Sequence, residues 1–119
     1  MRPDGGNAAH LWDMLDAAQA LQGFVRDRTA DDYANDRMLR GAVERYIELI
    51  AEAAGRISTS YRIAHPDIPW RNIIAQREVI THGYGAIKHS LMWKLASVHV
   101  PELIQQLEPL IPAPPPSTE

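Results

Sequence analysis

The chain contains no cysteine, which excludes disulfide bonds, thiolate nucleophiles and cysteine-based zinc sites together. No apolar run approaches the roughly 18 residues that a membrane-spanning helix needs. The amino terminus also lacks the apolar segment of a signal peptide. We therefore expect no contact with a membrane and a cytoplasmic location.

An excess of basic residues is also missing, because 12 Lys and Arg stand against 15 Asp and Glu, for a formal net charge of −3. No global positive field would draw nucleic acid from a distance, so any contact with RNA or DNA has to come from a local basic patch. The hydrophobic fraction of 45% and the charged fraction of 23% are typical of a folded protein. At 119 residues the chain is about one domain long.

Strand patterns are absent as well, since no stretch alternates apolar and polar residues between turn signals. Apolar residues instead recur at steps of three and four, which predicts helices. Both ends are rich in proline, glycine and small polar residues. We expect flexible tails over residues 1–7 and 112–119 and one helical domain over residues 8–111.

The helical periodicity and the turn signals together predict an all-α fold. Asn7, Thr29 and Asp67 are candidate N-caps, and Pro101 should kink the last helix near His99. Short connections between long helices favour an antiparallel up-and-down four-helix bundle with extra short helices. The long helices are expected over residues 10–28, 36–60, 69–82 and 87–111, with a short one after Thr29.

The segment "QREVITHGY", residues 76–84, brings Arg77, His82 and Tyr84 to the end of a predicted helix. Arg77 falls in line with Ile73, Ile80 and Tyr84, so it should be buried or lie at an interface and needs a partner or a ligand. His82 lies about 140° around the helix from Arg77. The two can converge only if the helix unwinds at its end or if two chains pair about a two-fold axis.

These residue types suit the cleavage of RNA. An imidazole that titrates near neutrality can take the proton of a ribose 2′-hydroxyl, and a guanidinium can hold the phosphate through two hydrogen bonds. This chemistry needs no metal ion or cofactor. A structural alternative remains open, in which Tyr84 packs, Arg77 forms a salt bridge and His82 caps the end of the helix.

Several flanking residues are candidates for contact with RNA. Trp70 can stack on a base or pack against the long helix. The basic residues near the motif can contact phosphates or can simply be solvated, namely Arg62, Arg71 and Lys88. The other histidines lack metal-ligand spacing with acidic partners, and we expect structural or surface roles for His65, His89 and His99.

The order Arg77, four residues, His82, one residue, Tyr84, preceded by "IPWRNI", resembles the signature of the HepT-like toxins of the HEPN superfamily. The segment "LWDMLDAAQAL" resembles the first helix of that family, "AVERYIELIAEAAGRIS" its long helix, and "VPELIQQLEPL" its carboxy-terminal segment. The resemblance covers roughly residues 11 to 111.

This resemblance implies a homodimeric all-α bundle that acts as a metal-independent endoribonuclease, with active sites at the dimer interface. Arg77 and His82 would be the catalytic pair. Tyr84 would be the residue that a partner antitoxin, a nucleotidyltransferase of the MNT type, modifies with AMP. Bulky negative groups beside an RNA-binding cleft would repel phosphate, which explains the inhibition. The chain would thus be the toxin of a type II- or VII-like toxin–antitoxin module.

Glu78 departs from the family pattern, which commonly has an asparagine directly after the arginine. A carboxylate there can pair with Arg77 or disfavour the RNA backbone, or it can orient His82 at i+4. A second function therefore stays open, in which the chain is a non-catalytic helical partner of a nucleotidyltransferase. We expect the dimer to form through residues 11 to 28 or 69 to 84.

Overall fold

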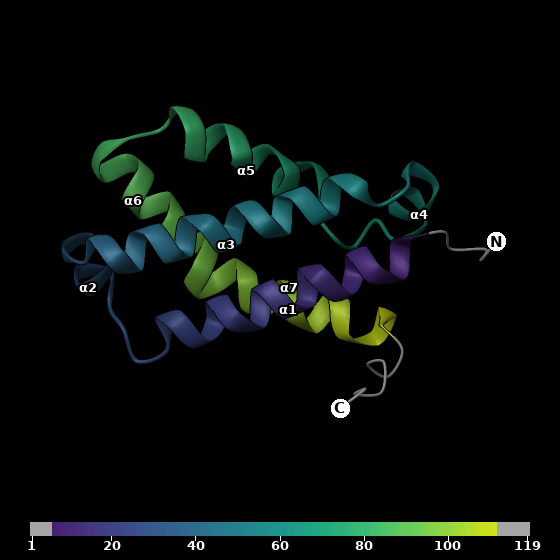
Figure 1. The fold of residues 1–119 in the computed structure, drawn as a ribbon, viewed down its shortest axis with the longest axis horizontal. Helices are drawn as coiled ribbons and strands as arrows, with labels where there is room; N and C mark the ends of the chain where they lie inside the picture. The colour runs from purple at the N-terminus through teal and green to yellow at the C-terminus, as the bar shows by residue number, and fades with distance from the viewer. Residues whose placement is uncertain (1–5, 112–119) are drawn as a thin grey trace.

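The computed structural model describes residues 6–111, and these residues form helices and turns without a strand (Figure 1). The all-α prediction is confirmed. None of the helices in this range combines the length and the apolar character needed to cross a membrane. The predicted tails lie largely outside the described residues. The helices are α1 (Asn7–Val25), α2 (Ala30–Asn35), α3 (Arg37–Arg56), α4 (Thr59–Ala64), α5 (Trp70–His82), α6 (Gly85–Lys94), the π-helix η1 (Leu95–His99), α7 (Val100–Leu107) and the 3₁₀ turn η2 (Glu108–Leu110).

Helix α3 lies at the centre of the molecule, with α1 along one side and α5 along the other (Figure 1). The run α6–η1–α7 crosses behind α3, and α7 packs against α1. The buried core comes mainly from the apolar stripes of α1, α3 and α7. Burial of such stripes supplies most of the favourable free energy of folding. The large side chains of this core that are fully buried include Met14, Leu21, Val43, Met92 and Leu107.

Local capping follows the sequence closely at α2 and α3. The Thr29 hydroxyl accepts from the backbone N–H of Asp32, and the Asp32 carboxylate accepts from the backbone N–H of Thr29, which completes a capping box. Asp36 caps α3 by accepting from the N–H of Leu39. Helix α3 ends at Arg56, short of the predicted Ser60, because Ile57 adopts an extended conformation.

Two of the predicted caps are wrong. The Asn7 side chain is buried inside the first turn of α1, where it accepts from the N–H of Ser58 and donates to the Ser58 hydroxyl, both at 3.0 Å. The buried amide thus ties α1 to the junction of α3 and α4. Pro69 stands at the start of α5, and the Asp67 carbonyl instead accepts from the Gln106 side chain. The side chain of Asn7 and the backbone carbonyl of Asp67 thus have partners that are remote in sequence.

The predicted kink near His99 takes the form of the π-helix η1. Pro101, in the first turn of α7, has no backbone N–H to donate to a carbonyl four residues earlier, and its ring crowds that carbonyl. A wider π turn accommodates such a disruption without ending the helix. The chain therefore continues from α6 into α7 as one bent rod.

Tyr33 is the only large side chain of the short helix α2, and it packs this helix against α6. Its ring contacts His89 and Trp93 with centroids 6.2 and 5.8 Å away. Its hydroxyl is buried, and no partner for it lies among the described residues. Burial, reinforced by the carboxylate of Glu44, raises the pKa of Tyr33 well above its ordinary value.

The Asn7 amide should contribute strongly to stability. We expect Asn7→Ala to lower the free energy of unfolding by about 1 to 3 kcal/mol, because it removes a buried amide that makes two hydrogen bonds to Ser58. Urea unfolding followed by circular dichroism measures the difference. Asn35→Ala is the control, since that exposed amide makes only a local bond to Asp31, and it should cost less than about 0.5 kcal/mol. Equal effects of the two substitutions would contradict the assignment.

Candidate functional site

Helix α5 carries the candidate residues and is fixed at both ends. At its start Trp70 is buried and donates its indole N–H to the carbonyl of His65 at 2.9 Å. At its end the N–H of Gly83 donates to the carbonyl of Val79 at 2.7 Å. A Cβ atom on Gly83 would lie 2.6 Å from that carbonyl oxygen, so this tight exit requires glycine. Gly85 follows with a positive φ of 73°.

Arg77 faces α3, where its Nη2 lies 3.9 Å from Oε2 of Glu52. Its side chain is 55% exposed, so burial within the single chain, one of the two predicted settings of Arg77, is wrong, and the other, an interface, stays a prediction. Ile73 lines a groove on the other side of α5, whereas Arg77 and Ile74 line the side toward Glu52. Residues four apart share one face of a helix, and the two side chains diverge from that face, Ile73 toward the groove and Arg77 toward Glu52.

His82 ends α5 and pairs with Glu78, with Nδ1 lying 3.1 Å from Oε2. The imidazole is 72% exposed. Helix α5 stays regular through His82, so unwinding does not carry the imidazole toward Arg77. Of the roles left open for Glu78, the structure places its carboxylate on His82 rather than on Arg77. A proton on Nδ1 would be shared with the carboxylate, which leaves Nε2 free to accept one.

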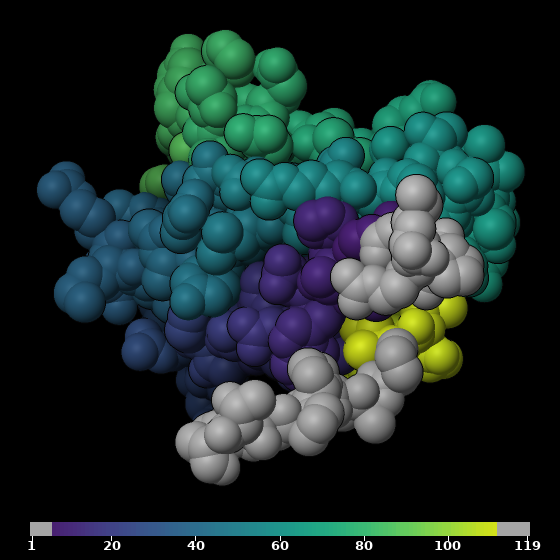
Figure 2. Space-filling model, turned by 45° about the vertical axis from the view of Figure 1, so that its right-hand side comes forward, coloured from purple at the N-terminus to yellow at the C-terminus, as the bar shows by residue number. Residues whose placement is uncertain are grey.

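Tyr84 stands between α5 and α6, and its side chain is 86% exposed. It does not pack against the core, which removes that part of the structural alternative. In the space-filling view the green residues at the end of α5 and the start of α6 rise above the blue surface of α3 (Figure 2). Exposed apolar side chains continue from Tyr84 along this rod, at Ile87, Leu91 and Val98.

The flanking candidates divide into two groups. Arg71 is exposed and makes no hydrogen bond or ion pair with the residues that the structure describes, so its contact with RNA stays a prediction. Trp70 is buried and offers no face on which a base could stack, which supports the packing alternative. The Lys88 side chain is only 14% exposed, and its ammonium group donates to the carbonyl of Ile80 at 2.9 Å and pairs with Glu44 at 3.2 Å. Arg62 donates to the carbonyl of Ile57.

Each of His65, His89 and His99 contacts another residue of the chain. His65 shares a hydrogen bond with the carbonyl of Tyr61, His89 contacts the ring of Tyr33, and His99 pairs with Glu102 at 3.4 Å. Within residues 6–111, no three His, Asp or Glu side chains come together as a set of metal ligands. The residues therefore offer an arginine, a histidine and a tyrosine hydroxyl for chemistry.

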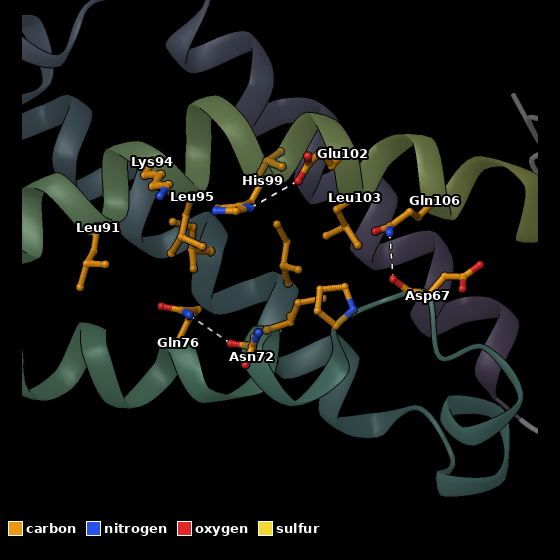
Figure 3. A pocket seen from close by; sticks show the side chains of 15 residues that line it. Asp67, Asn72, Gln76, Leu91, Lys94, Leu95, His99, Glu102, Leu103 and Gln106 are labelled. Carbon is orange, nitrogen blue, oxygen red and sulfur yellow. Dashed lines mark hydrogen bonds and ion pairs between the residues drawn. The ribbon is translucent and has the colours of Figure 1, made fainter.

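A groove of about 420 Å³ separates α5 from the rod formed by α6, η1 and α7 (Figure 3). Ile47 and Ile50 of α3 contribute to its apolar lining, and Asn72 and Gln76 of α5 face His99 and its neighbours across it. The sequence patterns did not reveal this groove, because its walls come from helices distant in the chain. The sequence patterns also did not reveal the contact between Glu52 and Arg77, because helix periodicity assigns Glu52 to a solvated face.

Fold and site together define an all-helical protein that presents an Arg-x4-His pair and an exposed tyrosine at one helix end. Comparison with known families identifies its class. The family model for HepT-like ribonucleases matches residues 14–110, and the chain belongs to this family. No solved structure gave a significant match.

Named relatives agree with this assignment. A protein of Methanocaldococcus jannaschii named "Putative RNase" is 32% identical over 100 residues, which covers 84% of this chain and 92% of the relative. A "Probable ribonuclease HepT" of Thermococcus cleftensis is 30% identical over 101 residues, covering 85% and 92% of the two chains. A Caldanaerobacter subterraneus protein, also named as an RNase, is 26% identical over 102 residues and covers 86% and 91%.

The contact between Glu78 and His82 predicts a specific tautomer. In neutral His82 the proton should reside on Nδ1, because the Glu78 carboxylate accepts from that nitrogen, and Glu78→Ala should shift the proton toward Nε2. Nitrogen-15 NMR of the imidazole distinguishes the two forms. The imidazole of His99, which pairs with Glu102, serves as an internal control and should not change. An unchanged tautomer of His82 in the variant would show that Glu78 does not orient it.

Proposed function

We propose that this protein is a metal-independent endoribonuclease, the cytoplasmic toxin of a two-gene toxin–antitoxin module. The observation that carries the proposal is the placement of Arg77 and His82, in the Arg-x4-His order, on one exposed helix end of a HepT-like ribonuclease. Both side chains are open to solvent, so a phosphodiester can reach the guanidinium and the imidazole.

The proposed reaction uses the ribose 2′-hydroxyl as nucleophile. Nε2 of His82 takes the proton while O2′ bonds to the neighbouring phosphorus and the bond from phosphorus to O5′ breaks. The products are a 2′,3′-cyclic phosphate and a 5′-hydroxyl, which receives its proton from an imidazolium of a second chain. Arg77 stabilises the charge that grows on the phosphoryl oxygens. A positioned general base contributes roughly 10² to 10⁴ in rate.

A homodimer completes this site in the proposal. Within one chain Arg77 faces Glu52 and His82 faces Glu78, so the two groups do not share a partner. A two-fold axis near α5 and α6 would bring the pair of one chain to that of the other. The exposed apolar side chains of Ile87, Leu91 and Val98 support this choice of surface, because apolar patches of this kind mark interfaces. Helix α1 buries its apolar stripe within its own chain.

Cleavage assays test the catalytic pair. We expect Arg77→Ala and His82→Ala each to lower the rate of RNA cleavage by at least about 100-fold, as the loss of a charge stabiliser or a general base does. Gel analysis of a labelled single-stranded RNA measures the rate. Arg26→Ala, which removes a remote exposed arginine, should leave the rate unchanged.

The same variants test the composite site. Light scattering should give twice the chain mass, and mixing the two inactive variants should restore part of the activity if residues from both chains form one site. Wild type and variants that leave RNA equally intact would refute the nuclease, whereas activity in a strictly monomeric protein would refute the composite site alone.

Tyr84 is the proposed site of control by the antitoxin. Its hydroxyl can attack the α-phosphorus of ATP bound to an MNT-type nucleotidyltransferase, releasing pyrophosphate and a proton and leaving AMP on the tyrosine. An exposure of 86% makes the hydroxyl accessible to a second protein. The added phosphate lies close in sequence to His82, where it would repel RNA.

Intact mass spectrometry tests this modification. Protein produced together with its nucleotidyltransferase neighbour should gain mass in whole AMP units and lose RNase activity. Tyr84→Phe should gain no such mass and stay active. Tyr46→Phe, which alters a half-buried ring packed on Phe24, should still be modified. Modification that persists in Tyr84→Phe would place it elsewhere.

One observation favours a second function. The carboxylates of Glu52 and Glu78 already face Arg77 and His82 within the chain. If Glu52 and Glu78 serve only to pair Arg77 and His82 structurally, the chain would be a non-catalytic partner of the nucleotidyltransferase. Stable binding of that enzyme together with intact RNA in every cleavage assay would select this function.

A further inference from the structure

A shallow hollow lies between α3 and α5, on the opposite side of α5 from the groove. It has a volume of about 280 Å³. We call it the α3–α5 hollow, and it is lined by Ala51, Glu52, Gly55, Arg56, Ile74 and Arg77. Alanine and glycine at two successive turns of α3 keep one wall free of long side chains. A Cβ atom built on Gly55 would meet nothing within 4 Å, so the space above that glycine is open.

Two guanidinium groups border this hollow from different helices. Arg56 is exposed and makes no hydrogen bond or ion pair within the described part of the chain. Arg77 lies 3.9 Å from Glu52, beyond hydrogen-bonding distance, so its N–H donors are free to bind an anion. With one carboxylate against two guanidiniums, the hollow carries a local positive charge in a chain whose net charge is negative.

We propose that the α3–α5 hollow binds a phosphate of the RNA strand adjacent to the phosphate that is cleaved. Arg56 is its main ligand, and the open wall of Ala51 and Gly55 lets the ribose-phosphate backbone approach α3. Guanidinium matches the geometry of phosphate oxygens through paired hydrogen bonds. Arg77 then lies between the cleaved phosphate and the adjacent phosphate, because it borders this hollow and also belongs to the proposed catalytic pair. This inference rests on the proposed ribonuclease function.

Glu52 limits what the hollow accepts. Its carboxylate holds Arg77 toward α3 and repels an anion that makes no compensating contact with Arg56. A phosphate has to engage both arginines to outweigh this repulsion. Arg56 also lies in the last turn of α3, where a cation stabilises the helix dipole, and this role alone would leave RNA binding unaffected.

The test measures RNA binding in a His82→Ala background, so that the strand is not cut. Fluorescence anisotropy with a labelled single-stranded RNA is recorded over a series of salt concentrations. Arg56→Ala should weaken binding by about tenfold and reduce the slope of log affinity against log salt by about 0.7 to 1, as the loss of one phosphate contact does. Arg37→Ala is the matched control, because it removes an exposed arginine from the opposite end of α3.

A second pair of variants tests the hollow without changing charge. Gly55→Leu should fill the open wall and weaken binding several-fold, whereas Gly41→Leu, at another open glycine of α3, should not. Both replace glycine by a better helix former, so neither should unfold the protein.

A third variant changes the charge of the hollow. Glu52→Gln should strengthen RNA binding, since it removes the repelling carboxylate.

The outcomes separate this inference from the ribonuclease proposal. If the parent binds RNA but Arg56→Ala and Gly55→Leu behave like their controls, the phosphate site is refuted and the ribonuclease stands. If Arg56→Ala lowers the melting temperature without changing RNA affinity, its role is confined to the helix dipole and the inference is likewise refuted. RNA that is neither bound by the parent nor cut by the wild type would overturn both.

Discussion

The ammonium group of Lys88 is the interaction on which the placement of the candidate site depends. It reaches from α6 to the carbonyl of Ile80 near the end of α5 and to the carboxylate of Glu44 on α3. The carbonyl belongs to the last turn of α5, where backbone oxygens lack partners within the helix. Because this one cation joins three helices and is largely shielded from solvent, it fixes the turn that carries His82, Gly83 and Tyr84.

Lys88 also shows where sequence reasoning fails. Beside the Arg-x4-His motif a lysine suggested contact with phosphate, yet its partner Glu44 lies 44 positions earlier, outside any local pattern. Interactions within one turn were predictable, such as the Thr29 cap and the approach of Glu78 to His82. Long-range polar contacts, such as that between Asn7 and Ser58, depend on how the helices pack and were not predictable from the sequence. Helix periodicity predicted the all-α class because it reports on burial directly.

Helix α5 is attached to the body along one side, which gives the site its openness. The groove toward α7 and the hollow toward α3 flank it, so Arg77 and His82 lie on a helix with free space on both sides. A site of this kind lacks the enclosing walls that exclude water and hold a substrate in catalytic enzymes. In the proposed function the RNA itself or a second chain would supply the missing walls, which is the physical reason that a dimer fits the proposed chemistry.

Electrostatic balance then decides how such an acidic protein can act on a polyanion. Each group of the proposed catalytic pair faces a carboxylate of its own chain, Glu52 for Arg77 and Glu78 for His82. These contacts orient the two side chains, the carboxylates would repel RNA, and exposed contacts of this kind contribute little free energy. A phosphate held by two guanidiniums can displace the long contact between Arg77 and Glu52. In the proposed function, binding of RNA would depend on cations that have no ion pair within residues 6–111, such as Arg56 at the end of α3 and Arg71 on α5. Any added phosphate on Tyr84 would compete with RNA for this same limited positive charge.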